Sequence, residues 1–165
     1  MPLLKNGQPI TDIWQPVADA DALPADGAVI ISFARWRKER ATLLGRNSPL
    51  GVRLANTDKV EEVAPDLERF EIVVLEFPKF VDGRAYSQAR LLRDRYGYRG
   101  ELRATGNVLR DELQFMQRCG IDAFEIADSR AVESWRAAVN EFSVFYQPAA
   151  DGHRTVSELR RAAAR

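Results

Sequence analysis

Three cations stand where apolar runs of the sequence end, and they could bind an anion. Lys79 and Arg84 follow one strongly apolar run, and Arg103 lies in the next run, which ends at Gly106 and Asn107. Lysine and arginine side chains bind anions, and the backbone N–H groups after a glycine add donors. The pattern therefore predicts an anion site made of Lys79, Arg84, Arg103, Gly106 and Asn107.

Charged residues also interrupt the apolar runs themselves. Arg53, Glu76, Arg103 and Glu125 each lie in or at the end of a successive run. They could pair across neighbouring strands, because a buried charge is costly unless it has a partner. Glu76 and Glu125 could instead act as general acid and base if the fold makes them adjacent. The sequence leaves open whether these residues form a site or structural salt bridges, and whether the protein is an enzyme.

The chain contains few residues that could form a metal site, a disulfide or a phosphate-binding motif. His153 is the single histidine and Cys119 the single cysteine, which excludes a multi-histidine zinc site, a cysteine cluster and an intrachain disulfide. We therefore expect no metal site, and we expect Cys119 to be a small buried residue at a helix end rather than a reactive thiolate. No glycine-rich phosphate motif follows an apolar run, and the cofactor is left open.

Five apolar, β-branched runs predict the strands that position these residues. They cover residues 28–31, 51–55, 71–77, 100–105 and 123–127, and helical patterns separate them. Strands that alternate with helices form a parallel sheet with right-handed crossovers. Ligands of such sheets bind at the carboxyl ends of the strands, which is where the predicted anion site lies.

Capping residues predict where several helices begin. Asp58 and Thr155 each stand three residues before a glutamate, which is the spacing of a capping box. Asp82, Asn107 and Ser129 are the expected starts of three further helices.

The charges inside the strands favour a sheet with one uncovered face. A parallel strand with helices on both sides is almost entirely apolar, and these strands are not. We therefore predict an α/β fold of about five parallel β-α units that form an incomplete (β/α) barrel. A doubly wound open sheet is the alternative. Because a half-barrel leaves open edges, we expect either a homodimer or cover from an N-terminal β-hairpin.

The chain reads as a single domain over residues 1–165. Residues 1–16 form the expected hairpin, with Leu3–Lys5 and Ile10–Trp14 on either side of a turn-rich segment. The β/α core is expected over residues 28–147. Residues 149–165 read as a polar tail, in part disordered, with a short helix after Thr155.

Overall composition narrows the class of partners. The formal net charge is zero, which gives no reason to expect nucleic-acid binding. No run approaches the roughly 20 apolar residues of a membrane span, and the first residues lack the pattern of a signal peptide. We expect a cytoplasmic protein without a membrane partner.

The central stretch resembles a known bacterial family. The motifs are Phe77-Pro78-Lys79-Phe80, Asp82-Gly83-Arg84, Arg95-Tyr96-Gly97, Gly100-Glu101-Leu102-Arg103-Ala104 and Arg118-Cys119-Gly120. They are similar to a family of unknown function whose members are described as oxidoreductases connected with sulfite reduction and are encoded beside assimilatory sulfite reductase. The resemblance runs from about Ile30 to Tyr146. It implies a process, assimilatory sulfur metabolism, and supplies no mechanism.

Three functions follow as hypotheses. The first is a cytoplasmic accessory protein of assimilatory sulfite reduction, which binds the reductase or its electron donor and holds an oxyanion through Lys79, Arg84 and Arg103. The second is a small oxidoreductase or other enzyme that uses Glu76 or Glu125, or a cofactor whose phosphate lies near Gly106. The third is an assembly partner without catalytic activity, for which an apolar patch around residues 13–14 would be the contact.

Overall fold

A single sheet of eight strands organises the molecule, for which the computed structural model describes residues 2–128 and 130–164. The strand order across the sheet is β2-β1-β8-β7-β6-β5-β4-β3. The strands are β1 (Leu3–Lys5), β2 (Gln8–Pro9), β3 (Gln15–Pro16), β4 (Val29–Ser32), β5 (Leu50–Leu54), β6 (Ile72–Phe77), β7 (Glu101–Gly106) and β8 (Ala123–Glu125).

The five strands from β4 to β8 are parallel, as the sequence predicts. Each lies beside the next one in the chain, so this part of the order never reverses. A doubly wound sheet contains a reversal, and a barrel does not. The order therefore excludes the doubly wound alternative and fits the predicted half-barrel.

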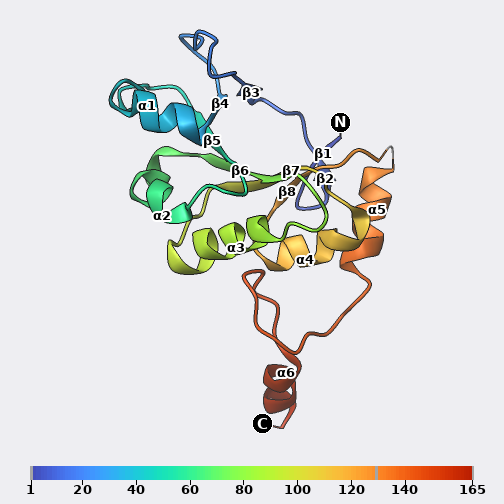
Figure 1. Ribbon diagram of the computed structural model, residues 1–165. Helices are drawn as coiled ribbons and strands as arrows, with labels where there is room; N and C mark the ends of the chain where they lie inside the picture. The colour runs from blue at the N-terminus through green and yellow to red at the C-terminus, as the bar shows by residue number, and fades with distance from the viewer. Residues whose placement is uncertain (1, 129, 165) are drawn as a thin grey trace.

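Helices that connect these strands cover one face of the sheet, and two more of the described helices follow the last strand. They are α1 (Phe33–Leu44), α2 (Val60–Val63), α3 (Arg84–Arg90), α4 (Leu113–Arg118), α5 (Ala131–Val139) and α6 (Val156–Ala163). Short 3₁₀ segments at Ala64–Arg69 and Arg110–Glu112 and a π-helical turn at Leu91–Arg95 complete the set. In Figure 1, α2, α3 and α4 lie below the sheet, while the chain from β1 to β3 passes above it. None of the helices in the described ranges has the length and apolarity to cross a membrane.

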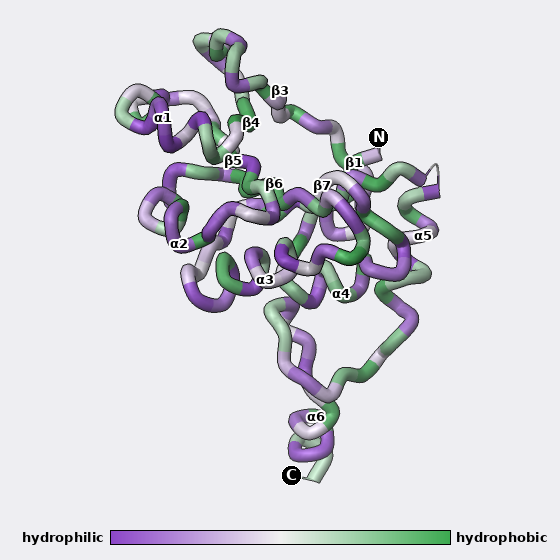
Figure 2. The backbone as a smooth tube through the Cα atoms, viewed as in Figure 1, coloured by the Kyte–Doolittle hydropathy of each residue, from purple (hydrophilic) through white to green (hydrophobic). Residues whose placement is uncertain are grey.

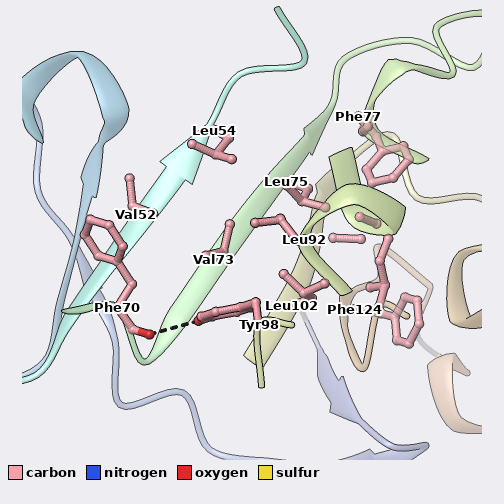
Figure 3. Packing of buried hydrophobic residues seen from close by; sticks show 14 of the residues in the cluster. Val52, Leu54, Phe70, Val73, Leu75, Phe77, Leu92, Tyr98, Leu102 and Phe124 are labelled. Carbon is pink, nitrogen blue, oxygen red and sulfur yellow. Dashed lines mark hydrogen bonds between the residues drawn. The ribbon is translucent and has the colours of Figure 1, made fainter. Parts of the chain in front are cut away.

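The core lies between the sheet and these helices. Val52, Val73, Leu75 and Leu102 point from neighbouring strands toward the helices and are almost fully buried (Figure 3). Burying a side chain of this kind stabilises a fold by roughly 1.5–3 kcal/mol. Tyr98 closes one end of the layer, because its hydroxyl donates a hydrogen bond of 3.1 Å to the Phe70 carbonyl oxygen.

The N-terminal segment differs from the expected hairpin, and the sheet has eight strands rather than five. A tight turn at Asn6 and Gly7, both with positive φ, does join β1 to a second strand. That second strand is β2, however, and not Ile10–Trp14. We call residues 10–14 the strap, because they cross the face of the sheet that carries no helices. Asp12 contacts Arg103 there, and these long-range contacts override the local strand pattern of the strap.

The two ends of this segment cover both edges of the parallel sheet. β1 pairs antiparallel with β8, and β3 pairs parallel with β4. The outermost strands, β2 and β3, have two residues each and both end in proline. Short strands with proline offer few free donors to another chain, so they protect the sheet against edge-to-edge pairing. Cover by the N-terminal segment is one of the two outcomes that the sequence predicts, and the homodimer stays a prediction.

Three of the expected helix starts differ from the structure. Lys59 precedes α2 without a side-chain cap, and Asp58 accepts a hydrogen bond from the Ala55 amide instead. Gly83 is the N-cap of α3, although Asp82 accepts the Arg84 amide at 3.3 Å. The helix expected from Asn107 begins only at Arg110–Glu112. The capping box of Thr155 and Glu158 is confirmed in α6, and Ser129 lies outside the described residues.

The last part of the chain forms an arm that leaves the body, and we call residues 140–164 the arm. Arg118 holds its base, with an ion pair to Asp151 of 3.1 Å and a stacking contact of 3.8 Å over the Phe145 ring. The helix α6 lies beyond this anchor, apart from the other helices (Figure 1), and green and purple residues alternate along it (Figure 2).

Candidate functional site

The uncovered face of the sheet carries the charged residues of the strands. Strand register places Ile72, Val74 and Glu76 of β6 on this face, while Val73 and Leu75 point to the helices. Arg53 of β5 lies opposite Val74, and Arg103 of β7 lies on the other side of the same residue. We call this surface the inner face. The face without helices carries the strand charges, as predicted, but the strap covers part of it, because Trp14 packs on Ile72 and Val74.

Arg103 is the centre of the inner face, and only 1% of its side chain is exposed. Its Nε donates to Glu101 at 2.9 Å, and its terminal nitrogens donate to the two carboxylate oxygens of Asp12 at 2.7 and 3.2 Å. Glu125 lies at 3.6 Å. Burial lowers the pKa of Arg103, but the hydrogen bonds to Asp12 and the charge of Glu101 outweigh it and raise the pKa above its ordinary value. The side chain therefore stays charged.

The ion pairs around Arg103 extend across the sheet. Lys5 of β1 donates to Glu101 at 2.8 Å. The Thr105 hydroxyl donates to Glu125 at 2.6 Å. We call Lys5, Asp12, Glu101, Arg103 and Glu125 the inner network. It holds two cations and three carboxylates, so it carries an excess of negative charge rather than the positive charge that an anion site needs.

Arg53 and Glu76 form a separate pair on the same face. Their side chains meet at 3.2 Å and are 43% and 37% exposed. Glu76 and Glu125 lie on alternate strands, with Thr105 of β7 between them. Two strand spacings separate their backbones by about 10 Å. The two carboxylates are therefore not adjacent, and a shared substrate would have to span Thr105 to meet both. The predicted cross-strand pairing of the charges is observed.

The other predicted anion-binding residues lie at the carboxyl edge of the sheet. Arg84 folds back on Asp82, with hydrogen bonds of 2.9 and 2.6 Å from its side chain. Asp82 also accepts from Asn56 at 2.5 Å. The Arg84 hydrogen bond is the main cause that holds the pKa of Asp82 down at about 2. The guanidinium of Arg84 is thus already paired with the carboxylate of Asp82.

Gly106 is needed for close packing of the chain on itself. Its φ is +95°, and a Cβ there would lie 2.6 Å from the Phe77 carbonyl oxygen. That same oxygen accepts the Asn107 amide at 2.7 Å, and the Val108 amide donates to the Gly106 carbonyl at 3.0 Å. The backbone donors after Gly106 are therefore used within the fold.

The structure does not gather the predicted anion site at one point. Arg103 contacts carboxylates of the inner network, and Arg84 contacts Asp82. Lys79 lies in the loop after β6 and is exposed. An anion at Arg103 would compete with Asp12, whereas one at Lys79 would not compete with any ion pair found in residues 2–128 and 130–164. The anion site stays a prediction, and Lys79 is the one of its three cations for which no ion pair is found among the described residues.

The loop of residues 78–83, which we call the edge loop, presents apolar side chains beside Lys79. Phe80 is 58% exposed and Val81 is 86% exposed. Exposed apolar side chains that gather in a patch with a polar rim are a feature of protein contacts.

Sequence reasoning missed Lys5, Asp12 and Glu101 as members of the inner network. Glu101 and Arg103 stand two residues apart on one strand, so strand alternation could have placed them on the same face. Asp12 gave no signal, because its contact depends on the path of the strap.

The remaining titratable candidates offer no obvious chemistry. Cys119 is buried, as predicted, and burial raises the pKa of its thiol to about 11. His153 is exposed in the arm and lies against the Phe145 ring. In the two described ranges, no group of three His, Cys, Asp or Glu side chains could hold a metal ion.

These features define a mixed α/β protein with an eight-stranded half-barrel sheet and a network of paired charges on its uncovered face. Residues 51–157 match the model of the family of bacterial proteins of unknown function called DUF934. The chain belongs to this family, because the match covers more than half of its length. The matched region includes the edge loop and Arg103, but not Asp12 or the strap. A comparison with curated proteins finds no match.

Proposed function

We propose that this protein is a cytoplasmic accessory protein of assimilatory sulfite reduction, and that it binds the reductase or its electron donor through the edge loop. The process comes from the resemblance of residues 77–120, whose first motifs, Phe77-Pro78-Lys79-Phe80 and Asp82-Gly83-Arg84, coincide with this loop. The observation that carries the proposal is the exposure of Phe80 and Val81 beside Lys79.

A binding role fits the inner face better than catalysis does. Glu76 is paired with Arg53, and Glu125 accepts from Thr105. Neither carboxylate faces the other, so these two residues do not form an acid–base pair, although the enzyme hypothesis needs only one of them. An oxyanion carried to the reductase would contact Lys79 at the edge of the binding surface.

Growth on sulfate as sole sulfur source tests the proposal. A strain without the protein is complemented by the wild type and by variants, and growth on cysteine serves as the control for general fitness. We expect Phe80→Ser/Val81→Ser to abolish complementation and to reduce co-purification of sulfite reductase by at least about tenfold, because exposed apolar anchors dominate such contacts. Leu44→Ser, at an apolar residue on α1 that is 44% exposed, is the matched control.

Two further variants separate the other hypotheses. Ile13 of the strap is 73% exposed, and loss of complementation in Ile13→Ser alone would move the contact to the strap, as the assembly-partner hypothesis requires. Loss in Glu125→Gln, with reductase binding intact, would favour an enzyme. Full growth of the edge-loop variant would refute the proposed contact.

A further inference from the structure

The C-terminal helix α6 buries none of its own residues. It has eight residues, a complete capping box, and an apolar stripe formed by Val156, Leu159 and Ala163. Leu159 is 40% exposed. Helices shorter than about 12–15 residues are marginally stable in water unless an apolar side is packed. The α6 stripe therefore calls for a surface that covers it.

The base of the arm forms an apolar groove, which could receive a helix with an apolar stripe. The groove has a volume of about 510 Å³ and lies against α4, the end of α5 and residues 142–146. Its apolar lining includes Phe115, Phe142 and Tyr146, which are 56%, 59% and 88% exposed. Three aromatic side chains at this exposure form an apolar patch that monomers rarely leave uncovered.

The charges of the helix and of the groove are complementary. Arg160 borders the apolar stripe of α6, whereas Arg161 lies on the opposite side of the helix and Glu158 is bound to its own cap at Thr155. Asp111 and Glu141 lie at the groove. The groove also contains Arg118, but Asp151 neutralises it at 3.1 Å. A basic helix with an apolar stripe thus fits an acidic groove with an apolar floor.

We propose that two copies of this chain exchange the end of the arm beyond its base, so that α6 of each copy lies in the groove of the other. Val156 and Leu159 pack on the aromatic floor, and Arg160, which borders the stripe, faces Asp111 and Glu141. A second copy is the one partner for which the chain itself supplies both surfaces. Reciprocal exchange uses each surface once per copy and closes as a two-fold dimer. This interface is independent of the proposed role of the edge loop.

Sedimentation equilibrium and light scattering on the full chain test the exchange. The wild type is expected to have twice the 18.6 kDa mass of one chain. Leu159→Asp places a charge in the apolar contact and is expected to give a monomer. Arg160→Glu and Asp111→Arg/Glu141→Arg each set like charges against one another and should weaken the dimer by at least about tenfold. The variant with all of these charge reversals restores opposite charges and should restore the dimer.

A matched control reverses two charges elsewhere. Lys38 on α1 and Lys59 before α2 are exposed, and Lys38→Glu/Lys59→Glu should leave the dimer unchanged. Circular dichroism of each variant checks that the fold persists. A monomeric wild type would overturn the proposal and leave the groove to another protein. A dimer that survives Leu159→Asp, or that the combined charge reversal does not restore, would overturn the α6–groove contact. Larger open assemblies would overturn reciprocal exchange.

Discussion

Replacing Arg103 by methionine decides whether the inner network is scaffold or site. The change keeps the apolar stem and removes the guanidinium, which is 1% exposed. Glu101, 8% exposed, would keep Lys5 as its partner but lose the hydrogen bond of 2.9 Å from Arg103. Breaking a buried ion pair by removing one partner typically costs about 3–5 kcal/mol of unfolding free energy. We expect a loss in this range, because Asp12, 38% exposed, can regain water while Glu101 cannot.

Urea unfolding, followed by tryptophan fluorescence, measures this loss, provided that the slope of unfolding free energy against urea concentration is the same in both proteins. Arg53→Met is the matched control. It removes the same group from the same face, but its pair with Glu76 is well exposed, so we expect a loss of about 0–1 kcal/mol. Arg103→Lys keeps a positive charge and should lose less unfolding free energy than Arg103→Met. The lysine variant remains informative if the methionine variant does not fold. A double variant with Glu101→Gln should lose less than the sum of the two single changes. Equal losses for Arg103→Met and Arg53→Met would refute the reasoning and return Arg103 to the candidate anion site.

Two further predictions rest on the carboxyl edge. Gly106 and Gly27 share a φ of +95°, but a Cβ at Gly27 would meet nothing within 4 Å. In urea unfolding, Gly27→Ala should lose about 1–2 kcal/mol of unfolding free energy, and Gly106→Ala should lose clearly more. Equal losses would contradict the close packing of Gly106 on Phe77. The Asp82 carboxylate should titrate at about pH 2 by NMR and move toward its ordinary pKa of 3.8 in Arg84→Ala. Because the pKa of Asp82 is lowered in the folded state, its stabilising effect is present above pH 3.8 and is lost as the pH falls toward 2. An unchanged midpoint of the Asp82 titration in Arg84→Ala would exclude Arg84 as the cause of the lowered pKa.

The parallel core could be predicted because its signals are local. Each strand is a short apolar run between turn residues, and the alternation with helices fixes a parallel sheet. Even the uncovered face was predictable, because Arg53, Glu76 and Arg103 would be costly beneath a second layer of helices. The doubly wound alternative was excluded only by the strand order.

The remaining features depend on contacts between distant parts of the chain. Ile10–Trp14 alternates like a strand, but the Asp12–Arg103 pair and the packing of Trp14 on Ile30 and Ile72 fix it as the strap. The anion site was predicted from the positions of cations at strand ends, and that rule does not reveal which carboxylates pair with those cations in the fold. The Arg84–Asp82 pair could have been predicted, since the two residues are only two positions apart, whereas Asp12 could not be foreseen as the partner of Arg103.

The position of β1 has a consequence for synthesis on the ribosome. Residues 3–5 pair with residues 123–125, so a segment that is made before the whole parallel core must wait for the last strand of that core. Until β8 is made, β7 has no neighbour on one side, and the nascent sheet offers an open edge to other chains. Pairings between such distant segments also close slowly. Folding during translation is therefore expected to leave the β1–β8 step until most of the chain has been made, which gives chaperones a defined interval in which to act.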